Sequence, residues 1–228
     1  MNPESILADI TPLAPDLRQR TQEVSRLLEL SQSAAKRERG PSGAWDVATG
    51  QGIVFSAPHE VTHFRDGVEK TAEQGTGPLA LALARYTGGI GITTAAEQDG
   101  DPNWDIDHPY IERVDNLAAS SPTIDLHMMR PRGVDVCIGL GPVPLLTQGL
   151  WPVFVEEAAA AGLRVSLNWP FWAGPRSVTG QLQARGRKAI QLELTWECFD
   201  PAHLAMARSW SFLARAARRL ARMRTSSA

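Results

Sequence analysis

From residue 44 onward, short apolar runs alternate with segments of helical periodicity, and this alternation constrains the fold more than any other feature of the chain. Strands separated by helices imply a mostly parallel or mixed sheet that helices cover on both faces. We therefore predict an α/β fold in a single domain, with a mixed, mostly parallel sheet flanked by helices. The predicted strands are 52–57, 90–94, 123–127, 134–140, 163–167 and 188–194, and the predicted helices are 77–86, 109–119, 151–161 and 201–223.

The first forty residues carry a helical pattern of their own, over about residues 16–36, which ends at the breaker Arg39-Gly40-Pro41. We predict an N-terminal helical extension over 1–40 and the main domain over 41–228. A helix packed on the core is favoured over a partner-binding arm. Its apolar stripe consists of Leu17, Val24, Leu27, Leu28 and Ala35, and Leu30 falls outside that stripe.

Composition gives no sign of a highly charged partner. The chain has 228 residues, 43% of them hydrophobic, and a formal net charge of -2, so neither nucleic acid nor an anionic membrane is expected. Cys137 and Cys198 lack CxxC spacing, which fits two free thiols in a reducing compartment. Because no apolar stretch approaches the ~18 residues of a membrane span and the N-terminus lacks a signal-peptide pattern, the expected location is cytoplasmic.

The last predicted helix combines an apolar stripe with five arginines that share another face. Such a face could hold phosphates, but a solvated helix face near a C-terminus has the same pattern, and cations are favourable near a helix end. Nucleic acid is therefore an unfavoured partner. The five arginines are Arg208, Arg215, Arg218, Arg219 and Arg222.

The segment His59-Glu60-Val61-Thr62-His63 has the letters of the zincin motif, in which two histidines one helical turn apart bind zinc and the glutamate activates water. That motif needs a helix. Here the segment follows Pro58, contains two β-branched residues and is closed by the turn signal Asp66-Gly67. The zincin interpretation is therefore disfavoured.

Three predicted strands end close to a histidine or a carboxylate: His59 follows 52–57, His127 ends 123–127, and Glu193 lies in 188–194. Strand ends in α/β proteins open into the crevice where ligands bind. Two imidazoles and one carboxylate are a recurrent ligand set for catalytic zinc, with a fourth position open. A metal-dependent hydrolase is the leading hypothesis.

For the third ligand the residues leave more than one candidate. Glu73 is the favoured carboxylate, and Glu60 and His63 remain as substitutes. Asp125 lies two residues before His127 on the same strand, so it points the same way and could orient a ligand through its second ring nitrogen.

Six segments in a fixed order resemble one known family over about residues 50–197. They are Ser-Ala-Pro-His59, Ala-Glu73-Gln-Gly-Thr76 (preceded by Arg65-Asp-Gly), Asp101-Pro-Asn103-Trp-Asp, Asp125-Leu-His127, Leu167-Asn168-Trp-Pro-Phe and Gln191-Leu-Glu193-Leu. The pattern resembles the N-formylglutamate amidohydrolases, a family similar to the zinc carboxypeptidases and the aspartoacylases, and the Pro-His and Asp-Leu-His segments are its distinctive parts.

This resemblance implies a mixed sheet between helices with one Zn²⁺ at the strand ends. It implies that His59, Glu73 and His127 are the metal ligands and that Glu193 is the general base. The chain departs from the family at Glu60 and Met128, where a small residue is usual after each histidine, so the reaction class transfers better than the substrate.

Several residues are candidates for contacts with a small-molecule or peptide-like amide substrate. Arg65, Arg130 or Arg132 could balance an oxyanion or hold a carboxylate, and Arg130 is favoured because it closely follows His127. Asn103 and Asn168 lie in proline-containing loops and could supply specificity, although turn chemistry explains them equally well. The aromatic residues of Trp169-Pro-Phe171-Trp172 suggest a wall near the site.

The sequence thus predicts a zinc-dependent amidohydrolase that cleaves an N-acyl amino acid or a small peptide-like amide. The alternative, favoured by Glu60 and Met128, is a catalytically inactive relative that acts as a binding or regulatory protein.

Overall fold

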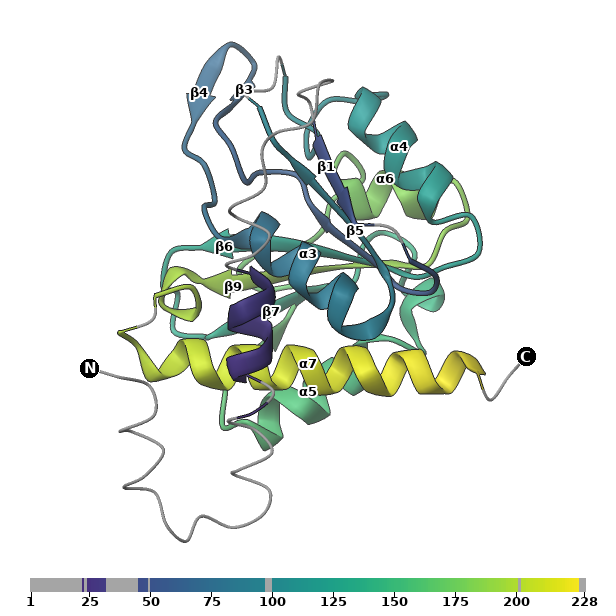
Figure 1. Cartoon of the computed structure of the whole chain (residues 1–228). Helices are drawn as coiled ribbons and strands as arrows, with labels where there is room; N and C mark the ends of the chain where they lie inside the picture. Colours follow the sequence, from purple (N-terminus) through teal and green to yellow (C-terminus); the bar gives the residue numbers. More distant parts are fainter. Residues whose placement is uncertain are drawn as a thin grey trace, which may run out of the picture.

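The computed structural model describes residues 22, 24–31, 45–48, 50–96, 100–200 and 202–225. The boundary predicted between residues 40 and 41 lies outside these residues. Figure 1 shows a twisted sheet with the long helix α7 (Leu204–Thr225) running along one side of it.

A seven-stranded sheet in the order β1-β5-β2-β6-β9-β7-β8 forms the centre of the described fold. Four of the strand pairs are parallel, whereas β1 with β5 and β7 with β9 are antiparallel, so the predicted mixed, mostly parallel sheet is confirmed. The strands are β1 (Trp45–Ala48), β2 (Val54–Ala57), β5 (Ile90–Thr94), β6 (Thr123–Met129), β7 (Val136–Gly139), β8 (Val165–Leu167) and β9 (Ala189–Thr195).

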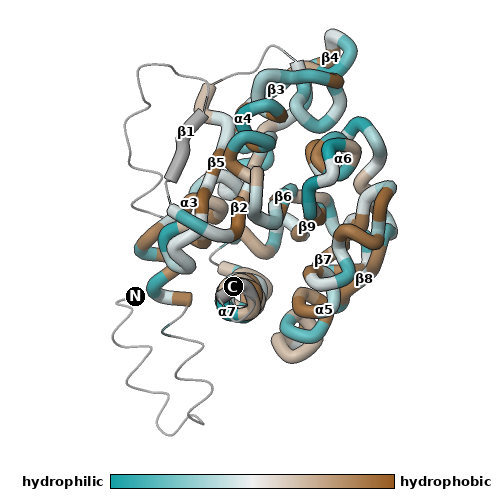
Figure 2. Tube along the Cα trace, turned by 90° about the vertical axis from the view of Figure 1, so that its right-hand side faces the viewer, coloured by the Kyte–Doolittle hydropathy of each residue, from teal (hydrophilic) through white to brown (hydrophobic). Residues whose placement is uncertain are grey.

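Helices cover both faces of this sheet. On one face, α3 (Thr76–Thr87), α5 (Trp151–Ala160) and α7 pack on the larger apolar core. On the other, α4 (Pro109–Leu117) and α6 (Val178–Ala184) pack on a smaller core. In Figure 2, α7 is seen end-on between α3 and α5, with α4 and α6 across the sheet.

The alternation of side chains along the central strands decides which residues enter each layer. Ile124 and Leu126 of β6 and Leu192 of β9 enter the larger core, so the residues between them face the α4/α6 side. Asp125, His127 and Glu193 are among those intervening residues. The polar site therefore lies on the face that the smaller helices leave partly uncovered.

The N-terminal helical pattern is found over residues 24–31, where the chain is helical. Leu27 is fully buried in the larger core, with Val24, Leu28 and Leu30 packed against it. These residues thus pack on the core as a helix, and Leu30 joins the contact although it lies off the predicted stripe. Leu17 and Ala35 lie outside the described residues.

Helix α7 has the predicted apolar stripe, since Met206, Trp210, Leu213, Ala217 and Leu220 are all buried. On its arginine face, Arg215 pairs with Glu157 and Arg219 with Glu156, both acids of α5, and Arg218 stacks on the Tyr86 ring. These contacts give the arginines a structural role between helices.

Strand β1, one short hairpin and helix α6 are among the described elements that were not predicted. The hairpin of β3 (His63–Arg65) and β4 (Val68–Lys70) is too short to show a strand pattern. Helix α6 is only seven residues long and buried on almost every side, so it lacks the one-sided apolar periodicity that identifies a helix. Its N-cap is Ser177, whose side chain accepts from the Gly180 N–H.

Both cysteines are buried and unpaired, as expected. Among the described helices, none has the length and apolarity needed to cross a membrane.

Candidate metal centre

Three adjacent parallel strands bring polar side chains to the α4/α6 face of the sheet. Ser56 of β2 is in register with Asp125 of β6, and Asp125 with Gln191 of β9. One step further toward the strand ends, His127 is in register with Glu193. Because side chains two positions apart on a strand share a face, these groups form one polar surface.

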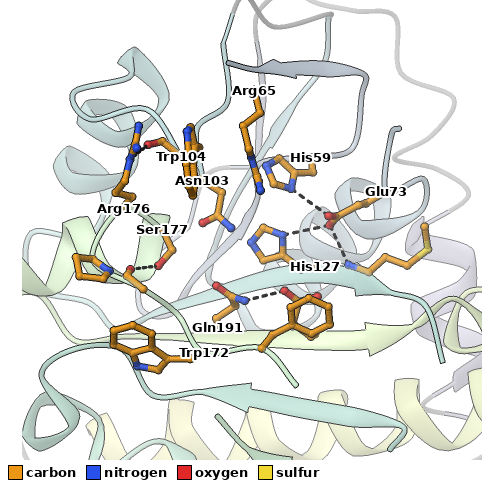
Figure 3. Close-up of a pocket in the computed structure, with 15 residues that line it drawn as sticks. His59, Arg65, Glu73, Asn103, Trp104, His127, Trp172, Arg176, Ser177 and Gln191 are labelled. Carbon is orange, nitrogen blue, oxygen red and sulfur yellow. Dashed lines mark hydrogen bonds and ion pairs between the residues drawn. The ribbon is translucent and has the colours of Figure 1, made fainter. Parts of the chain in front are cut away.

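The loop after β2 adds the remaining members. Pro58 and His59 follow directly on β2, and the main-chain N–H of Glu73 donates to the His59 carbonyl at 2.7 Å. This bond joins two loops that are 14 residues apart and brings the Glu73 side chain between the two histidines (Figure 3).

The Glu73 carboxylate is shared by both imidazoles. His59 Nδ1 lies 3.0 Å from Glu73 Oε1, and His127 Nδ1 lies 3.2 Å from Glu73 Oε2. The Met128 main-chain N–H also donates to Oε2, at 2.9 Å. The structure thus brings together the three residues predicted as metal ligands, from two strand ends and one loop.

Each histidine has a second carboxylate at its other ring nitrogen. His59 Nε2 lies 2.8 Å from Asp101 Oδ1, and His127 Nε2 lies 3.0 Å from Asp125 Oδ2. Both aspartates are fully buried. A carboxylate at Nε2 fixes the ring orientation and leaves Nδ1 to face a metal, which is the usual support of a metal-binding histidine.

The outer carboxylates are themselves held by donors. Asp101 accepts from Arg65 Nε at 2.6 Å and from the Asn103 main-chain N–H at 2.8 Å. Asp125 accepts from the Ser56 hydroxyl at 2.8 Å. These bonds lower the cost of burying two acids beside the histidines, because a buried carboxylate is stable only when it is paired and hydrogen-bonded.

The charges of the site stabilise one another. Burial alone would raise the pKa of Glu73, but the two histidines outweigh it and hold that pKa well below its usual range. Burial alone would lower the pKa of His127, but Asp125 and Glu73 outweigh it and raise the pKa well above the ordinary value. Burial outweighs the attraction of the two histidines at Glu193 and raises the pKa of that carboxyl to about 7.

The three residues fit a transition metal. One ligand atom from each of His59, Glu73 and His127 lies within 4.8 Å of the others. Two neutral imidazoles and a carboxylate suit Zn²⁺ and related divalent ions, and three protein ligands leave room for water or substrate.

Glu60 does not take part in this cluster. Its carboxylate turns to the N-terminus of α3, where Oε2 accepts from the main-chain N–H groups of Gly75 at 2.9 Å and Gly77 at 2.8 Å. Glu60, named above as a substitute ligand and as a departure from the family, therefore lies outside the cavity, because its carboxylate caps main-chain N–H groups that lack helical partners at the start of α3.

The His-Glu-x-x-His segment is not helical: residues 58–61 form turns and bends, and His63 begins β3. This geometry excludes the zincin arrangement. His63 instead stacks on His59, with ring centroids 3.9 Å apart, and burial lowers its pKa to about 4.

His59, His63 and Asp101 form a second group with ligand atoms within 4.8 Å of one another. His63 Nε2 lies 3.6 Å from Asp101 Oδ2, and that oxygen already binds the Arg65 guanidinium. A cation is therefore already present at this carboxylate, and the group is less suited to a metal than the Glu73 group.

A cavity of about 440 Å³ opens over the cluster. Arg65, Asn103 and Met128 line it, as do Phe171 and Trp172 of the predicted aromatic wall, whereas Trp169 is 60% exposed and lies outside it. The other lining residues are His59, Glu73, Trp104, His127, Gly174, Pro175, Arg176, Ser177, Gln191 and Glu193.

Two predicted site residues are not brought to this cavity. Arg130 follows the last residue of β6, where the chain leaves the sheet, and its side chain is exposed. Closeness to His127 in sequence therefore does not place it at the site. Asn168 is exposed at a positive φ of 57°, and its side chain accepts from the Leu140 N–H at 2.8 Å, so turn chemistry explains it.

The prediction missed four residues that matter here: Asp101, Trp104, Arg176 and Gln191. The Gln-x-Glu alternation was a usable signal for Gln191, because residues two apart on a strand share a face. The other three come from loops, and no periodicity indicates where a loop side chain points.

No protein-family model and no curated protein matches the sequence. Solved structures do match its fold. An N-formylglutamate amidohydrolase from Ralstonia eutropha JMP134 aligns over 82% of this chain and 100% of its own, with a TM-score of 0.56 and 15% identity. A bacteriophage poly-gamma-glutamate hydrolase aligns over 86% of this chain and 96% of its own, with a TM-score of 0.55 and 14% identity.

A putative carboxypeptidase from Burkholderia mallei ATCC 23344 aligns over 87% of this chain and 67% of its own, with a TM-score of 0.50 and 12% identity. The chain has a zinc-carboxypeptidase-like fold. The resemblance to N-formylglutamate amidohydrolases seen in the sequence motifs is thus confirmed for the fold. The solved structures that share this fold are named as an amidohydrolase, a hydrolase and a putative carboxypeptidase. At these identities the likeness carries no further than the fold.

Proposed function

We propose that this protein is a zinc-dependent amidohydrolase that cleaves a small N-acyl amino acid or peptide-like amide. The observation that carries the proposal is the convergence of His59 Nδ1, His127 Nδ1 and the Glu73 carboxylate in a cavity that Glu193 also lines. His59, Glu73 and His127 would hold one Zn²⁺ per chain. The fold likeness to amidohydrolases and carboxypeptidases supports this reaction class.

A zinc ion held there would lower the pKa of a bound water to about 7 and polarise the scissile carbonyl. Glu193 would act as general base and acid, first accepting a proton from water and then delivering it to the leaving amine. Burial raises the pKa of Glu193 to about 7, which suits a group that both takes and returns a proton near neutrality.

The chemistry of the cavity wall favours a substrate that carries a carboxylate. Arg65 and Arg176 both stack on Trp104, with guanidinium carbons 5.1 and 4.1 Å from the ring centroid. Apart from Glu73 and Glu193, the residues that line the cavity include no acid. Trp104 lines the cavity, and its buried Nε1 has no hydrogen-bond partner among the described residues.

Asn103 would serve this wall by positioning. Its Oδ1 accepts from the Val178 N–H at 2.7 Å and so joins the loop that carries Asn103 to the first turn of α6, which begins two residues after Arg176. Its amide nitrogen is then the end of the side chain that remains to donate to a substrate. Arg130, Arg132 and Asn168 have no part in this proposal.

Two residues, Glu60 and Met128, favoured the alternative of an inactive binding protein. Glu60 no longer supports it, because its side chain caps α3 and does not line the cavity. Met128 remains, since it lines the cavity beside His127. A cytoplasmic location stays a prediction from the sequence.

The first test is the metal content of protein purified without added metal, measured by elemental mass spectrometry. We expect about one zinc per chain, lost in His127→Ala and kept in His203→Ala, because His203 is half-exposed and distant in the chain from the cluster. Hydrolysis of a panel of N-acyl amino acids should stop with a chelator and return with zinc. Absence of metal from the wild-type protein would favour the binding-protein alternative.

A further inference from the structure

Gln191 and Glu193 lie two positions apart on β9, and both side chains enter the cavity wall from the same face of the sheet. Gln191 Nε2 donates to Glu193 Oε1 at 2.7 Å. Gln191 is 3% exposed and Glu193 is 7% exposed, so water screens this bond little. Among the described residues, Gln191 is the one whose side chain hydrogen-bonds to the Glu193 carboxylate.

This bond decides which way the Gln191 amide points. An ionised carboxylate only accepts, so Gln191 must present its NH₂ group to Glu193, and its oxygen must face the other way. Figure 3 shows the Gln191 oxygen on the side of Asn103 and Ser177, away from the dashed bond.

The Gln191 oxygen is buried and has no hydrogen-bond partner among the described protein groups. A buried acceptor without a donor costs free energy in the folded protein. While the nitrogen is held by Glu193, this oxygen remains the unsatisfied end of the planar amide and can accept from a donor that enters the cavity.

We propose that Gln191 positions the scissile amide of the substrate against Glu193: its oxygen accepts the substrate N–H while its nitrogen holds the Glu193 carboxylate. The inference rests on the proposed amidohydrolase function and names a substrate feature, a secondary amide with an N–H. Gln191 is a positioning residue for the proton delivery that Glu193 performs.

The arrangement fits the bond changes of the reaction. The water oxygen bonds to the carbonyl carbon, one water proton moves to Glu193, the C–N bond breaks, and Glu193 passes that proton to the departing nitrogen. The nitrogen can accept the proton only if its lone pair faces Glu193. An acceptor that fixes the direction of the substrate N–H also fixes the direction of the nitrogen lone pair. With one planar amide, Gln191 would therefore orient both the Glu193 carboxylate that gives the proton and the nitrogen that receives it.

The test compares an amide substrate with the ester of the same acyl and leaving groups, which has no N–H. Gln191→Leu removes both hydrogen bonds at similar volume. Loss of the bond to Glu193 should slow both substrates, whereas loss of the acceptor should affect the amide alone. We expect the ratio of kcat/KM for amide over ester to fall about tenfold, the size of one hydrogen bond.

A second variant controls for misfolding, and a binding measurement tests the hydrogen bond to the substrate without relying on turnover. Gln191→Met should repeat the change in ratio, and both variants should keep wild-type zinc content and melting temperature within a few degrees. In the background of Glu193→Gln, calorimetric titration should show that Gln191→Leu weakens amide binding several-fold and leaves ester binding unchanged.

The outcomes separate the two proposals. If wild-type protein loaded with zinc hydrolyses neither substrate, the proposed function and this inference both fail. If it hydrolyses the amide but Gln191→Leu slows amide and ester equally, the inference alone is overturned, and Gln191 acts only on Glu193.

Discussion

Replacing Glu60 separates the two roles that its position allows. In the zincin interpretation Glu60 would be the general base, so its loss would abolish turnover and leave stability intact. In the structure the Glu60 carboxylate instead caps α3, accepting from the N–H groups of Gly75 and Gly77 and, at 3.4 Å, from the Thr76 hydroxyl. We therefore expect Glu60→Ala to destabilise the fold and spare the metal.

The size of the effect follows from the bonds that are lost. Two short main-chain bonds contribute about 1 kcal/mol each, and the longer Thr76 bond adds less, so the expected loss is roughly 2–3 kcal/mol. At about 2–4 °C per kcal/mol for a chain of this size, the melting temperature should fall by about 5–10 °C. Glu60→Gln keeps an acceptor oxygen, so its expected cost is below about 1 kcal/mol.

The assay is urea unfolding with a chelator present, so that metal binding does not add to stability. Burial raises the pKa of Glu60 to about 7, and the measurement at pH 8 therefore compares the ionised acid with its replacements. Glu69→Ala is the matched control, because Glu69 is exposed on β4. Unchanged stability in Glu60→Ala together with loss of zinc would refute this role for Glu60.

Three further predictions follow from the same geometry. Glu193→Gln should keep zinc and lower kcat at least about a hundredfold because an amide cannot carry the proton, and near-normal kcat would remove Glu193 from the reaction. Arg176→Ala should raise the KM roughly tenfold for a substrate with a carboxylate, since one charge-assisted bond is lost, and leave the KM for its neutral amide counterpart unchanged. Steady-state kinetics on this matched pair tests the prediction, and an equal rise in both KM values would contradict it. Burial alone would raise the pKa of Asp135, but hydrogen bonds from Arg164 outweigh it and lower that pKa. The ionised carboxylate therefore stabilises the fold at any pH above the ordinary pKa of an aspartate. This contribution disappears as the pH falls through the lowered pKa. Asp135→Asn should accordingly cost less than about 1 kcal/mol at pH 7 in urea unfolding, and this cost should disappear once the pH lies below the lowered pKa. A difference that persists in acid would exclude the ion pair as its cause.

Much of the fold was predictable because periodicity reports burial. The alternation along 123–127 and 188–194 places Ile124, Leu126 and Leu192 in one core, and the same period of two places Asp125, His127 and Glu193 on the opposite face. Helix α7 shows its buried stripe equally plainly in the sequence. The fold class and the two strand-borne members of the site, His127 and Glu193, therefore needed no coordinates.

Loop residues behaved differently, because nothing in local patterning says where a loop side chain points. Arg130 stands three residues after His127 and is exposed, whereas Arg176, some 49 positions beyond His127, reaches the cavity. Glu60 adjoins His59 in the chain, yet the N–H groups at the start of α3 draw it away from the cavity. The acid that does contact the histidines is Glu73, which lies further along the chain.

By itself, the sequence determined the α/β class, the sheet residues that face the core and the histidines at two strand ends, since hydrophobic burial imposes a period on each strand and helix. Only the tertiary structure decided that Glu73 lies between His59 and His127, that Asp101 supports His59, and that Gln191 holds Glu193. Most of these contacts join groups far apart in the chain, and hydrogen-bond geometry selects them only after the sheet has brought the groups together.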